Sequence, residues 1–292
     1  MIDGSTQLTG IVGHPLTYTL SPLLHNTAFR EAGLNWRYLP FPIEEAAFDL
    51  AIPALEALGF AGANVTIPFK ERAVVYVDDL EGPAAKLKAV NTLLFSRGRV
   101  IGYNTDGAGF LSALEDASFR PDGKRAVIAG AGGAGKAAAL ALAAAGAAKI
   151  YLVNRSPERA RGLQALIERS APSAAVELAL TEGDLRSAVS DSDLVVNATP
   201  VGMTGHADET GLANAGIRKG QLVYDLVYWP PQTPLLKEAG RVGAARINGL
   251  EMLLYQAAEA FTIWTGQQAP IQRMRAALTS EVRRRSAVGE SP

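Results

Sequence analysis

The sequence predicts an α/β protein with two domains. Apolar strand patterns alternate with helical patterns along its 292 residues, and this length is typical of about two domains. A glycine-rich segment at 130–135 lies between an apolar run and an alanine-rich helical pattern, the order strand, tight turn, helix. A hydrophobic content of 48% with 20% charged residues is typical of a globular protein that buries a substantial core.

The overall composition argues against several classes of function. The net charge is −1, from 28 basic and 29 acidic residues, so we expect no nucleic-acid partner. Cysteine is absent, which excludes disulfides, zinc–thiolate sites and cysteine nucleophiles and fits a cytoplasmic protein. No signal peptide is evident and the alanine-rich stretch 137–148 is too short to span a bilayer, so we expect no membrane partner. The three histidines, at 14, 25 and 206, lack ligand spacing, so no metal site is expected.

The first strand, residues 8–13, leads into a loop with two hydroxyl side chains. Thr19 and Ser21 lie two residues apart, and Pro22 suits the first turn of a helix that ends at Gly33. One interpretation is that Ser21 caps this helix. The other is that the two hydroxyls bind a polyhydroxylated ligand. A strand over 36–41 and a helix over 44–58 follow.

The next strand, in the segment 62–70, carries a polar face that leads to a lysine. Alternation places Asn64 and Thr66 on the same face, Pro68 stops the strand, and Lys70 lies just beyond its end. Ligands of α/β sheets bind at the carboxyl ends of strands. Although a lone lysine is usually a solvated surface charge, this placement makes Lys70 a candidate site residue.

A hairpin follows, opened by Asn91 and turning through residues 96–99. The segment 104–107 closes it and starts the next helix. Thr105 or Asp106, taken singly, could simply cap that helix.

The glycine-rich segment begins the second half, after a strand that starts at Arg125. The spacing Gly130-x-Gly132-x-x-Gly135 fits the pyrophosphate loop of a Rossmann-like domain. Gly130 permits the tight turn, Gly132 lets the pyrophosphate approach, and Gly135 lets the helix pack close to the strand. The free N–H groups at the start of the helix over 135–145 would bind the anion. A simple helix-packing turn is the alternative.

The end of the second strand of this domain, residues 149–153, favours NADP over NAD. An acidic residue there would bind the ribose 2′-hydroxyl of NAD, but Asn154, Arg155 and Ser156 occupy the place, with Arg159 one turn later. A guanidinium attracts a 2′-phosphate that a carboxylate would repel. A solvated arginine before a helix is the alternative interpretation.

The remaining strands end beside the expected cofactor. A strand within 192–203 ends in small and polar residues, and further strands are expected over 222–228 and 244–249. The helix over 250–264 has one apolar stripe, with Gln256 beside it.

Taken together, these segments resemble the shikimate dehydrogenase family over nearly the whole chain, from Gly13 to Gly266. The matching segments are Gly13-His-Pro, Ser21-Pro-Leu-Leu-His-Asn26, Asn64-Val-Thr-Ile-Pro-Phe-Lys70, Ala89-Val-Asn-Thr92, Gly102-Tyr-Asn-Thr-Asp-Gly107, the glycine loop, Asn154-Arg-Ser156, Asn197-Ala-Thr-Pro-Val-Gly-Met203, Asp225-Leu-Val-Tyr228, and Asn248-Gly249 through Gln256.

The resemblance implies a role for each matching residue. Lys70 and Asp106 would be the catalytic pair. Contacts to the substrate carboxylate and hydroxyls would come from Thr19, Ser21, Asn64, Thr66, Asn91, Tyr228 and Gln256. Contacts to NADP(H) would come from Gly130, Ala131, Gly132, Gly133, Ala134, Gly135, Asn154, Arg155, Ser156, Arg159, Ala198, Thr199, Pro200, Met203, Val227, Gly249 and Met252.

It also implies an activity and a domain plan. The family reduces 3-dehydroshikimate to shikimate with NADPH, in chorismate and aromatic amino acid biosynthesis. The substrate domain would span residues 1–106, completed by helices in 250–292, and the Rossmann-like NADP domain would span 107–249, with a cleft between them. The protein would act on this small molecule as a monomer or homodimer.

The chemistry explains why a lysine with an aspartate is needed. Hydride transfer to a ketone leaves an alkoxide that must receive a proton. A lysine beside the carbonyl can stabilise the oxyanion and pass that proton, and general acid–base catalysis contributes on the order of 10²–10⁴-fold. NADPH supplies the hydride, so no metal is needed.

One departure from the family and two alternatives bear on this prediction. The family usually has His-Ser-x-Ser where this chain has Tyr18-Thr19-Leu20-Ser21; threonine keeps the hydroxyl, whereas Tyr18 bears on fine specificity. The first alternative is a relative that uses quinate as well as shikimate, often with NAD. The segment 154–156 counts against the use of NAD, but it does not decide between the substrates. A non-catalytic dinucleotide sensor would need the glycine loop but not Lys70 with Asp106.

Overall fold

The computed structural model describes residues 2–203 and 211–287, which fold into two compact units. Of the described residues, unit 1 contains 2–109 together with 253–287, and unit 2 contains 110–203 together with 211–252. The two boundaries fall inside helices α4 (Asp106–Asp116) and α9 (Gly249–Thr265). The domain limits proposed from the sequence, 106/107 and 249/250, lie at the first residues of the same two helices.

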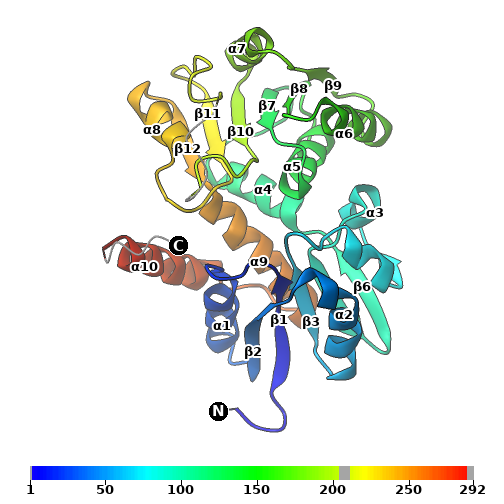
Figure 1. The fold of residues 1–292 in the computed structure, drawn as a ribbon. Helices are drawn as coiled ribbons and strands as arrows, with labels where there is room; N and C mark the ends of the chain where they lie inside the picture. The colour runs from blue at the N-terminus through cyan, green and yellow to red at the C-terminus, as the bar shows by residue number, and fades with distance from the viewer. Residues whose placement is uncertain (1, 204–210, 288–292) are drawn as a thin grey trace. The chain divides into compact units, whose positions relative to one another are not determined.

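Unit 1 is built on a mixed six-stranded sheet in the order β2-β1-β3-β5-β6-β4. Figure 1 labels β1, β2, β3 and β6 of this sheet. Its strands are β1 (Gln7–Gly13), β2 (Trp36–Pro42), β3 (Gly62–Val65), β4 (Asp79–Leu80), β5 (Thr92–Ser96) and β6 (Arg99–Tyr103). Strands β1, β2 and β3 run parallel, while β5 runs antiparallel to β3 and β6. The expected hairpin is therefore confirmed, and its two turn residues, Arg97 and Gly98, have φ of 53° and 72°, as a type I′ turn requires.

Helices from both ends of the chain belong to unit 1. They are α1 (Ser21–Glu31), α2 (Phe48–Ala57), α3 (Pro83–Leu87), most of α9, and α10 (Ile271–Ala287), with short 3₁₀ turns η1 (Glu45–Ala47) and η2 (Arg72–Tyr76). Helix α10 lies against α1 (Figure 1). Phe48 of α2 stacks on Phe69 with ring centroids 4.2 Å apart, and both side chains are fully buried. This packing fixes the segment that carries Lys70, the residue after Phe69.

Unit 2 is built on a parallel six-stranded sheet in the order β12-β11-β10-β7-β8-β9. The strands are β7 (Arg125–Ala129), β8 (Lys149–Val153), β9 (Ala175–Leu178), β10 (Leu194–Asn197), β11 (Leu222–Asp225) and β12 (Ala245–Asn248), and the helices are α5 (Gly133–Ala144), α6 (Pro157–Ser170), α7 (Glu182–Asp191) and α8 (Pro234–Arg241). Counted in chain order, the sheet reads 6-5-4-1-2-3, which is the Rossmann order. The strand order reverses between β7 and β10, so a ligand is expected beyond the carboxyl ends of these two strands.

The fold class predicted from the sequence is confirmed, but two local predictions are wrong. The strand that starts at Gly62 ends at Val65, so Thr66 and Lys70 both belong to the following turn. Helix α1 has Leu20 as its N-cap, with no side-chain capping bond among the described residues, so Ser21 is not the cap. In the described part of the chain, no helix combines the length and the apolar character needed to cross a membrane.

Candidate active site

Lys70 and Asp106 form an ion pair in unit 1. Lys70 Nζ lies 2.5 Å from Asp106 Oδ2, and the two side chains are 18% and 7% exposed. The Lys70 carbonyl accepts a bond from the Val90 N–H at 2.8 Å, which fixes the backbone after β3. Asp106 is the first residue of α4, but its own N–H is held by the Asn104 side chain at 3.2 Å. The carboxylate of Asp106 is thus turned to Lys70, and the alternative that Asp106 serves only as a cap loses its support.

Asn91 holds the second oxygen of this carboxylate. Its Nδ2 donates to Asp106 Oδ1 at 2.8 Å and to Thr105 Oγ1 at 3.0 Å, and its Oδ1 accepts from the Thr105 N–H at 2.9 Å. Asn91 is 3% exposed and Asp106 is 5% exposed. The buried Asn91 and the partly exposed Lys70 therefore orient the acidic member of the pair, and Thr105 helps to orient Asn91.

The side chain of Asn64 is also held inside the protein. Its Oδ1 accepts from the Tyr38 hydroxyl at 2.7 Å, while its Nδ2 donates to the Asn91 carbonyl at 3.1 Å and to Thr92 Oγ1 at 3.0 Å. Both amide hydrogens are thereby used. The predicted direct contact between Asn64 and the substrate stays a prediction, and its Oδ1 is the atom still able to accept a further donor.

The other predicted substrate contacts of unit 1 are half-buried or buried. Thr19 Oγ1 accepts from the Ser21 N–H at 3.3 Å, a local turn contact, and the Ser21 side chain is buried. Thr66 and Gln256 are half-buried, and Gln256 Nε2 donates to the Leu253 carbonyl of its own helix at 2.9 Å. Tyr228, also half-buried, belongs to unit 2, so its role beside this cluster stays a prediction.

The structure thus joins four of the predicted residues, Lys70, Asp106, Asn91 and Asn64, into one hydrogen-bonded cluster. Tyr38 and Thr92 also belong to that cluster, although the sequence did not indicate them. Thr92 could have been noticed because it follows Asn91 directly in the segment 89–92. Tyr38 carried no local signal, because it reads as an ordinary strand aromatic.

The three glycines of the unit 2 loop have the environments that a pyrophosphate site requires. Gly130 has φ of 111°, and a Cβ there would lie 2.6 Å from the Ala198 carbonyl oxygen. A Cβ on Gly135 would lie 2.0 Å from the Gly130 oxygen, so strand and helix pack too closely for any side chain. A Cβ on Gly132, in contrast, would meet no described atom within 4 Å. The loop is therefore closed to side chains where it packs and open where a ligand would approach.

The start of helix α5 adds donors to this opening. Gly132 is its N-cap, and no described side chain caps the first turn, so backbone N–H groups of residues such as Gly133 and Ala134 have no capping side chain, as an anion site requires. Asn154 Oδ1 accepts from the Ala131 N–H at 3.1 Å, and its Nδ2 donates to the Ser156 carbonyl at 2.9 Å. Asn154 thus links the glycine loop to the end of β8.

The predicted 2′-phosphate residues lie at the start of α6. Ser156 is the N-cap, and its Oγ accepts from the Arg159 N–H at 3.4 Å. The same hydroxyl donates to Glu158 at 2.9 Å. Hydrogen bonds from the backbone and from Ser156 hold the pKa of Glu158 below its ordinary value, so this carboxylate is charged at neutral pH. The side chains of Arg155 and Arg159 are exposed and form no ion pair within the described ranges, which leaves both guanidinium groups able to bind a phosphate.

The loop after β10 is shaped by a buried carboxylate. Asn197 Nδ2 donates to Asp225 Oδ1 at 2.8 Å and to the Val201 carbonyl at 3.1 Å. Asn197 Oδ1 accepts from the Thr199 hydroxyl at 2.6 Å, and Thr233 donates to Asp225 Oδ2 at 2.6 Å. Burial raises the pKa of Asp225 above its ordinary value, although three hydrogen bonds oppose that effect. The network fixes residues 198–201 beside Gly130.

The remaining predicted cofactor residues follow strands β10, β11 and β12 of unit 2. Met203 is 41% exposed and Pro200 is exposed, so both present surface to a ligand. A Cβ on Gly249 would lie 2.0 Å from the Leu226 oxygen, and the Gly249 N–H donates to the Val227 carbonyl at 3.2 Å. Met252 is 9% exposed. The residues at the ends of these strands therefore fit a dinucleotide. Among the described residues, no group of three His, Cys, Asp or Glu side chains is placed to hold a metal ion.

Family models match three segments that cover most of the chain. A shikimate dehydrogenase substrate-binding domain matches residues 11–93, a shikimate / quinate 5-dehydrogenase domain matches 113–206, and a shikimate 5′-dehydrogenase C-terminal domain matches 249–279. A shikimate dehydrogenase (NADP(+)) of Moorella thermoacetica is 47% identical over 273 residues, which is 94% of this chain and 92% of that protein.

The chain belongs to the shikimate dehydrogenase family. A solved shikimate dehydrogenase in complex with NADP⁺ superposes with a TM-score of 0.89 at 38% identity, covering 97% of this chain and 98% of that one. A shikimate 5-dehydrogenase from Listeria monocytogenes, solved with shikimate and NAD, gives a TM-score of 0.89 at 34% identity over 95% and 98% of the two chains. The family predicted from the sequence motifs is thereby confirmed.

Proposed function

We propose that this chain is an NADP-dependent oxidoreductase that reversibly reduces 3-dehydroshikimate to shikimate, with Lys70 and Asp106 as its acid–base pair. The family membership supports the reaction, since the curated relatives carry this activity and NADP(+) in their names. The predicted enzyme class and the predicted NADP(H) cofactor agree with those names. By family, the reaction belongs to aromatic amino acid biosynthesis.

The observation that carries the proposal is the Lys70–Asp106 pair at 2.5 Å, braced by the buried Asn91. In the reducing direction, Lys70 Nζ stabilises the negative charge that develops on the carbonyl oxygen and donates a proton to it. Asp106 keeps the Lys70 ammonium in place, and the neutral amine that remains after proton transfer takes up a new proton from solvent. Bound NADPH supplies the hydride.

The substrate would be bound by the hydroxyl and amide groups around this pair. Thr19 and Ser21 would bind the carboxylate, and Thr66, Asn91 and Gln256 would bind ring hydroxyls. Asn64 and Tyr228 complete the proposed set. Most of these side chains are uncharged donors and acceptors, which suits a small polyhydroxylated acid.

The cofactor would be bound by the glycine loop and by α6. The N-terminus of α5 would bind the pyrophosphate over Gly132, and Arg155 with Arg159 would bind the 2′-phosphate. Glu158, which accepts from the Ser156 hydroxyl, lies between these two arginines in the sequence, so selectivity depends on the two guanidinium groups outweighing its negative charge.

A test of the activity is the absorbance of the nicotinamide band after mixing the protein with shikimate and NADP⁺. We expect NADPH to form. No change with shikimate under conditions where the protein is folded would refute the proposal. Parallel assays with quinate and with NAD⁺ decide the alternative of broader substrate use, which the shikimate / quinate description of the matching family model favours.

We further propose that the protein acts in the cytoplasm as a monomer or homodimer without a nucleic-acid or membrane partner. The near-zero net charge and the absence of cysteine support this proposal. Light scattering of the purified protein measures the oligomeric state directly.

A further inference from the structure

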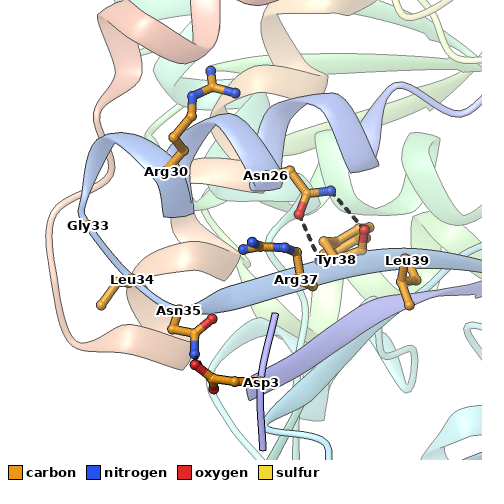
Figure 2. Close-up of a pocket in the computed structure, with 9 residues that line it drawn as sticks. All are labelled: Asp3, Asn26, Arg30, Gly33, Leu34, Asn35, Arg37, Tyr38 and Leu39. Atoms are coloured by element: carbon orange, nitrogen blue, oxygen red, sulfur yellow. Dashed lines mark hydrogen bonds between the residues drawn. The ribbon is translucent and has the colours of Figure 1, made fainter. Parts of the chain in front are cut away.

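The segment Ser21–Asn26 contains two side chains, His25 and Asn26, that the proposed site does not use. Both contact Tyr38. The Asn26 amide donates to the Tyr38 carbonyl at 2.8 Å and accepts from the Tyr38 N–H at 2.9 Å (Figure 2). The His25 ring stacks on the Tyr38 ring with centroids 4.3 Å apart and an interplanar angle of 11°. Trp264 of α9 lies against both rings, at 5.0 Å from His25 and 6.0 Å from Tyr38. Backbone and ring of Tyr38 are therefore both fixed.

The Tyr38 hydroxyl begins a chain of hydrogen bonds that ends at the proposed catalytic pair. It donates to Asn64 Oδ1 at 2.7 Å, and Asn64 Nδ2 donates to Thr92 Oγ1 at 3.0 Å. Thr92 Oγ1 donates to Asn91 Oδ1 at 2.9 Å, and Asn91 Nδ2 donates to Asp106 Oδ1 at 2.8 Å. Every donor in this sequence points towards Asp106.

The chemistry of its two ends gives the chain a single direction. The Asp106 carboxylate paired with Lys70 only accepts, so Asn91 must turn its NH₂ group to it and its oxygen to Thr92. Thr92 has one hydroxyl hydrogen, which it gives to Asn91, so it must accept from the NH₂ group of Asn64. The oxygen of Asn64 then faces Tyr38, which has to donate. Burial raises the pKa of Tyr38 well above its ordinary value, so the hydroxyl keeps its proton.

Water has little access to replace these bonds. Tyr38 and Thr92 are fully buried, and Asn91, Asn64 and Asp106 are 3%, 5% and 5% exposed. In such surroundings hydrogen bonds in series polarise one another, and a missing donor leaves an unsatisfied group. A change at Tyr38 is therefore transmitted along the chain rather than absorbed by solvent.

We propose that Tyr38 is a positioning residue for the Lys70–Asp106 pair and acts through Asn64, Thr92 and Asn91. The inference rests on the proposed function, which gives that pair its acid–base role. By donating to Asn64 Oδ1, Tyr38 holds the Asn64 side chain against Thr92, and Thr92 in turn holds the Asn91 amide that donates to Asp106. In the same way, His25 and Asn26 act by fixing Tyr38.

The experiment breaks the chain of hydrogen bonds at two places, with substitutions that nearly preserve the shape of each side chain. Thr92→Val replaces the hydroxyl with a methyl group, and Tyr38→Phe removes only the phenolic oxygen. Tyr38→Phe removes one hydrogen bond of the chain and Thr92→Val removes two. We expect kcat for shikimate oxidation to fall about tenfold in each, because either change leaves Asn91 less well held, with KM for NADP⁺ unchanged. Thr92→Ser keeps the hydroxyl and should recover most of the wild-type kcat.

A matched control and a double variant separate positioning from simple stabilisation. Tyr76→Phe removes a phenolic oxygen that bonds the exposed Asp49 at 2.6 Å, and it should leave kcat unchanged. Since both site variants break one chain, the double variant Tyr38→Phe/Thr92→Val should have nearly the kcat of a single variant. Independent effects would multiply to about a hundredfold loss.

Several outcomes overturn the inference. A wild-type kcat in Thr92→Val with a lowered melting temperature would assign Thr92 a purely structural role. Multiplying effects in the double variant would show that Tyr38 and Thr92 act separately. In both cases an active wild-type enzyme leaves the proposed function intact, whereas a wild-type protein that cannot oxidise shikimate overturns the proposed function and this inference together.

Discussion

The proposed site of unit 1 is formed by side chains, whereas the proposed site of unit 2 is formed mainly by backbone groups. In unit 1, the Lys70–Asp106 pair is held by side chains, and each of its neighbours has its own hydrogen-bonding partners. In unit 2, the cofactor loop is made of backbone, with glycines that leave room and a helix start that offers N–H groups. The arginines beside that loop are exposed. A site that orients a proton needs fixed side chains, whereas a site that binds a pyrophosphate needs the absence of side chains.

This difference predicts unequal consequences of substitution. Removing a side-chain group from the unit 1 cluster should slow the chemical step while leaving cofactor binding unchanged. Adding a side chain to the unit 2 loop should damage packing or cofactor binding while leaving the proton-transfer groups in place.

The largest effect is expected for Lys70→Ala. Loss of the ammonium group removes the proposed proton donor and the charge that stabilises the alkoxide, so kcat should fall on the order of 10²–10⁴-fold. NADP⁺ affinity, measured by fluorescence titration, should be that of the wild type. Lys86→Ala, a substitution of another lysine of the same unit, is the control and should be fully active. Turnover near wild type in Lys70→Ala would remove Lys70 from the catalytic pair.

The next effect compares Gly135→Ala with Gly132→Ala in the unit 2 loop. A Cβ added at position 135 would lie 2.0 Å from a backbone oxygen, so the free energy of unfolding should fall by about 1–3 kcal/mol. The Cβ added at position 132 would meet no described atom within 4 Å, so stability should be unchanged while NADP⁺ affinity falls. Equal stability and equal affinity in the two variants would contradict the proposed place of the pyrophosphate. Thermal unfolding and a binding titration measure the two quantities.

A smaller effect is expected for Arg155→Asp. The change replaces an attraction for the 2′-phosphate with a repulsion, and the ratio of kcat/KM for NADP⁺ over NAD⁺ should fall about thirtyfold. Arg161→Asp adds the same charge to an exposed position further along α6 and serves as the control. An unchanged ratio in Arg155→Asp would refute the role proposed for this arginine.

The smallest expected effect is the pH dependence of the stability of unit 1, which arises from the buried His25. Burial lowers the pKa of His25 to about 3, from an ordinary value of 6.5. Below pH 6.5 the unfolded chain binds a proton that the folded unit excludes, so stability falls as the pH falls. Between about pH 6.5 and 5.5 the free energy of unfolding of unit 1 should decrease by about 1 kcal/mol.

The measurement is hydrogen exchange of unit 1 amides across that range, compared between the wild type and His25→Leu. The variant should lack this pH-dependent component. An identical slope in both proteins would show that His25 takes up its proton in the folded state, contrary to its burial.

The sequence predicted the backbone-built site better than the side-chain cluster. Glycine spacing reports on local geometry, so the roles of Gly130, Gly132 and Gly135 could be predicted and the structure gives each the expected surroundings. Lys70 and Asp106 were predicted as a pair from the family motifs, and the structure brings them together. Their function as a pair stays a prediction.

Other features of the chain depend on contacts between distant residues and escaped prediction. Tyr38 and Thr92 lie far apart in the sequence and are linked only through Asn64. Ser21 was a plausible helix cap by its type, but the helix starts with Leu20 as its N-cap. The end of β3 at Val65 depends on its pairing with β1 and β5, which local alternation does not report.

The two hydrogen bonds from Asn26 to Tyr38 also bear on how the molecule avoids self-association. Strand β2 is the outermost strand of its sheet, where an unpaired N–H and C=O would invite another chain to add a strand. The amide of Asn26 occupies both groups of Tyr38, and Pro40 and Pro42 further along β2 have no N–H to offer. At Tyr38 the outer edge of β2 therefore offers neither an unpaired N–H nor an unpaired C=O, so the contact that fixes the tyrosine also disfavours the addition of a strand at this point of the edge.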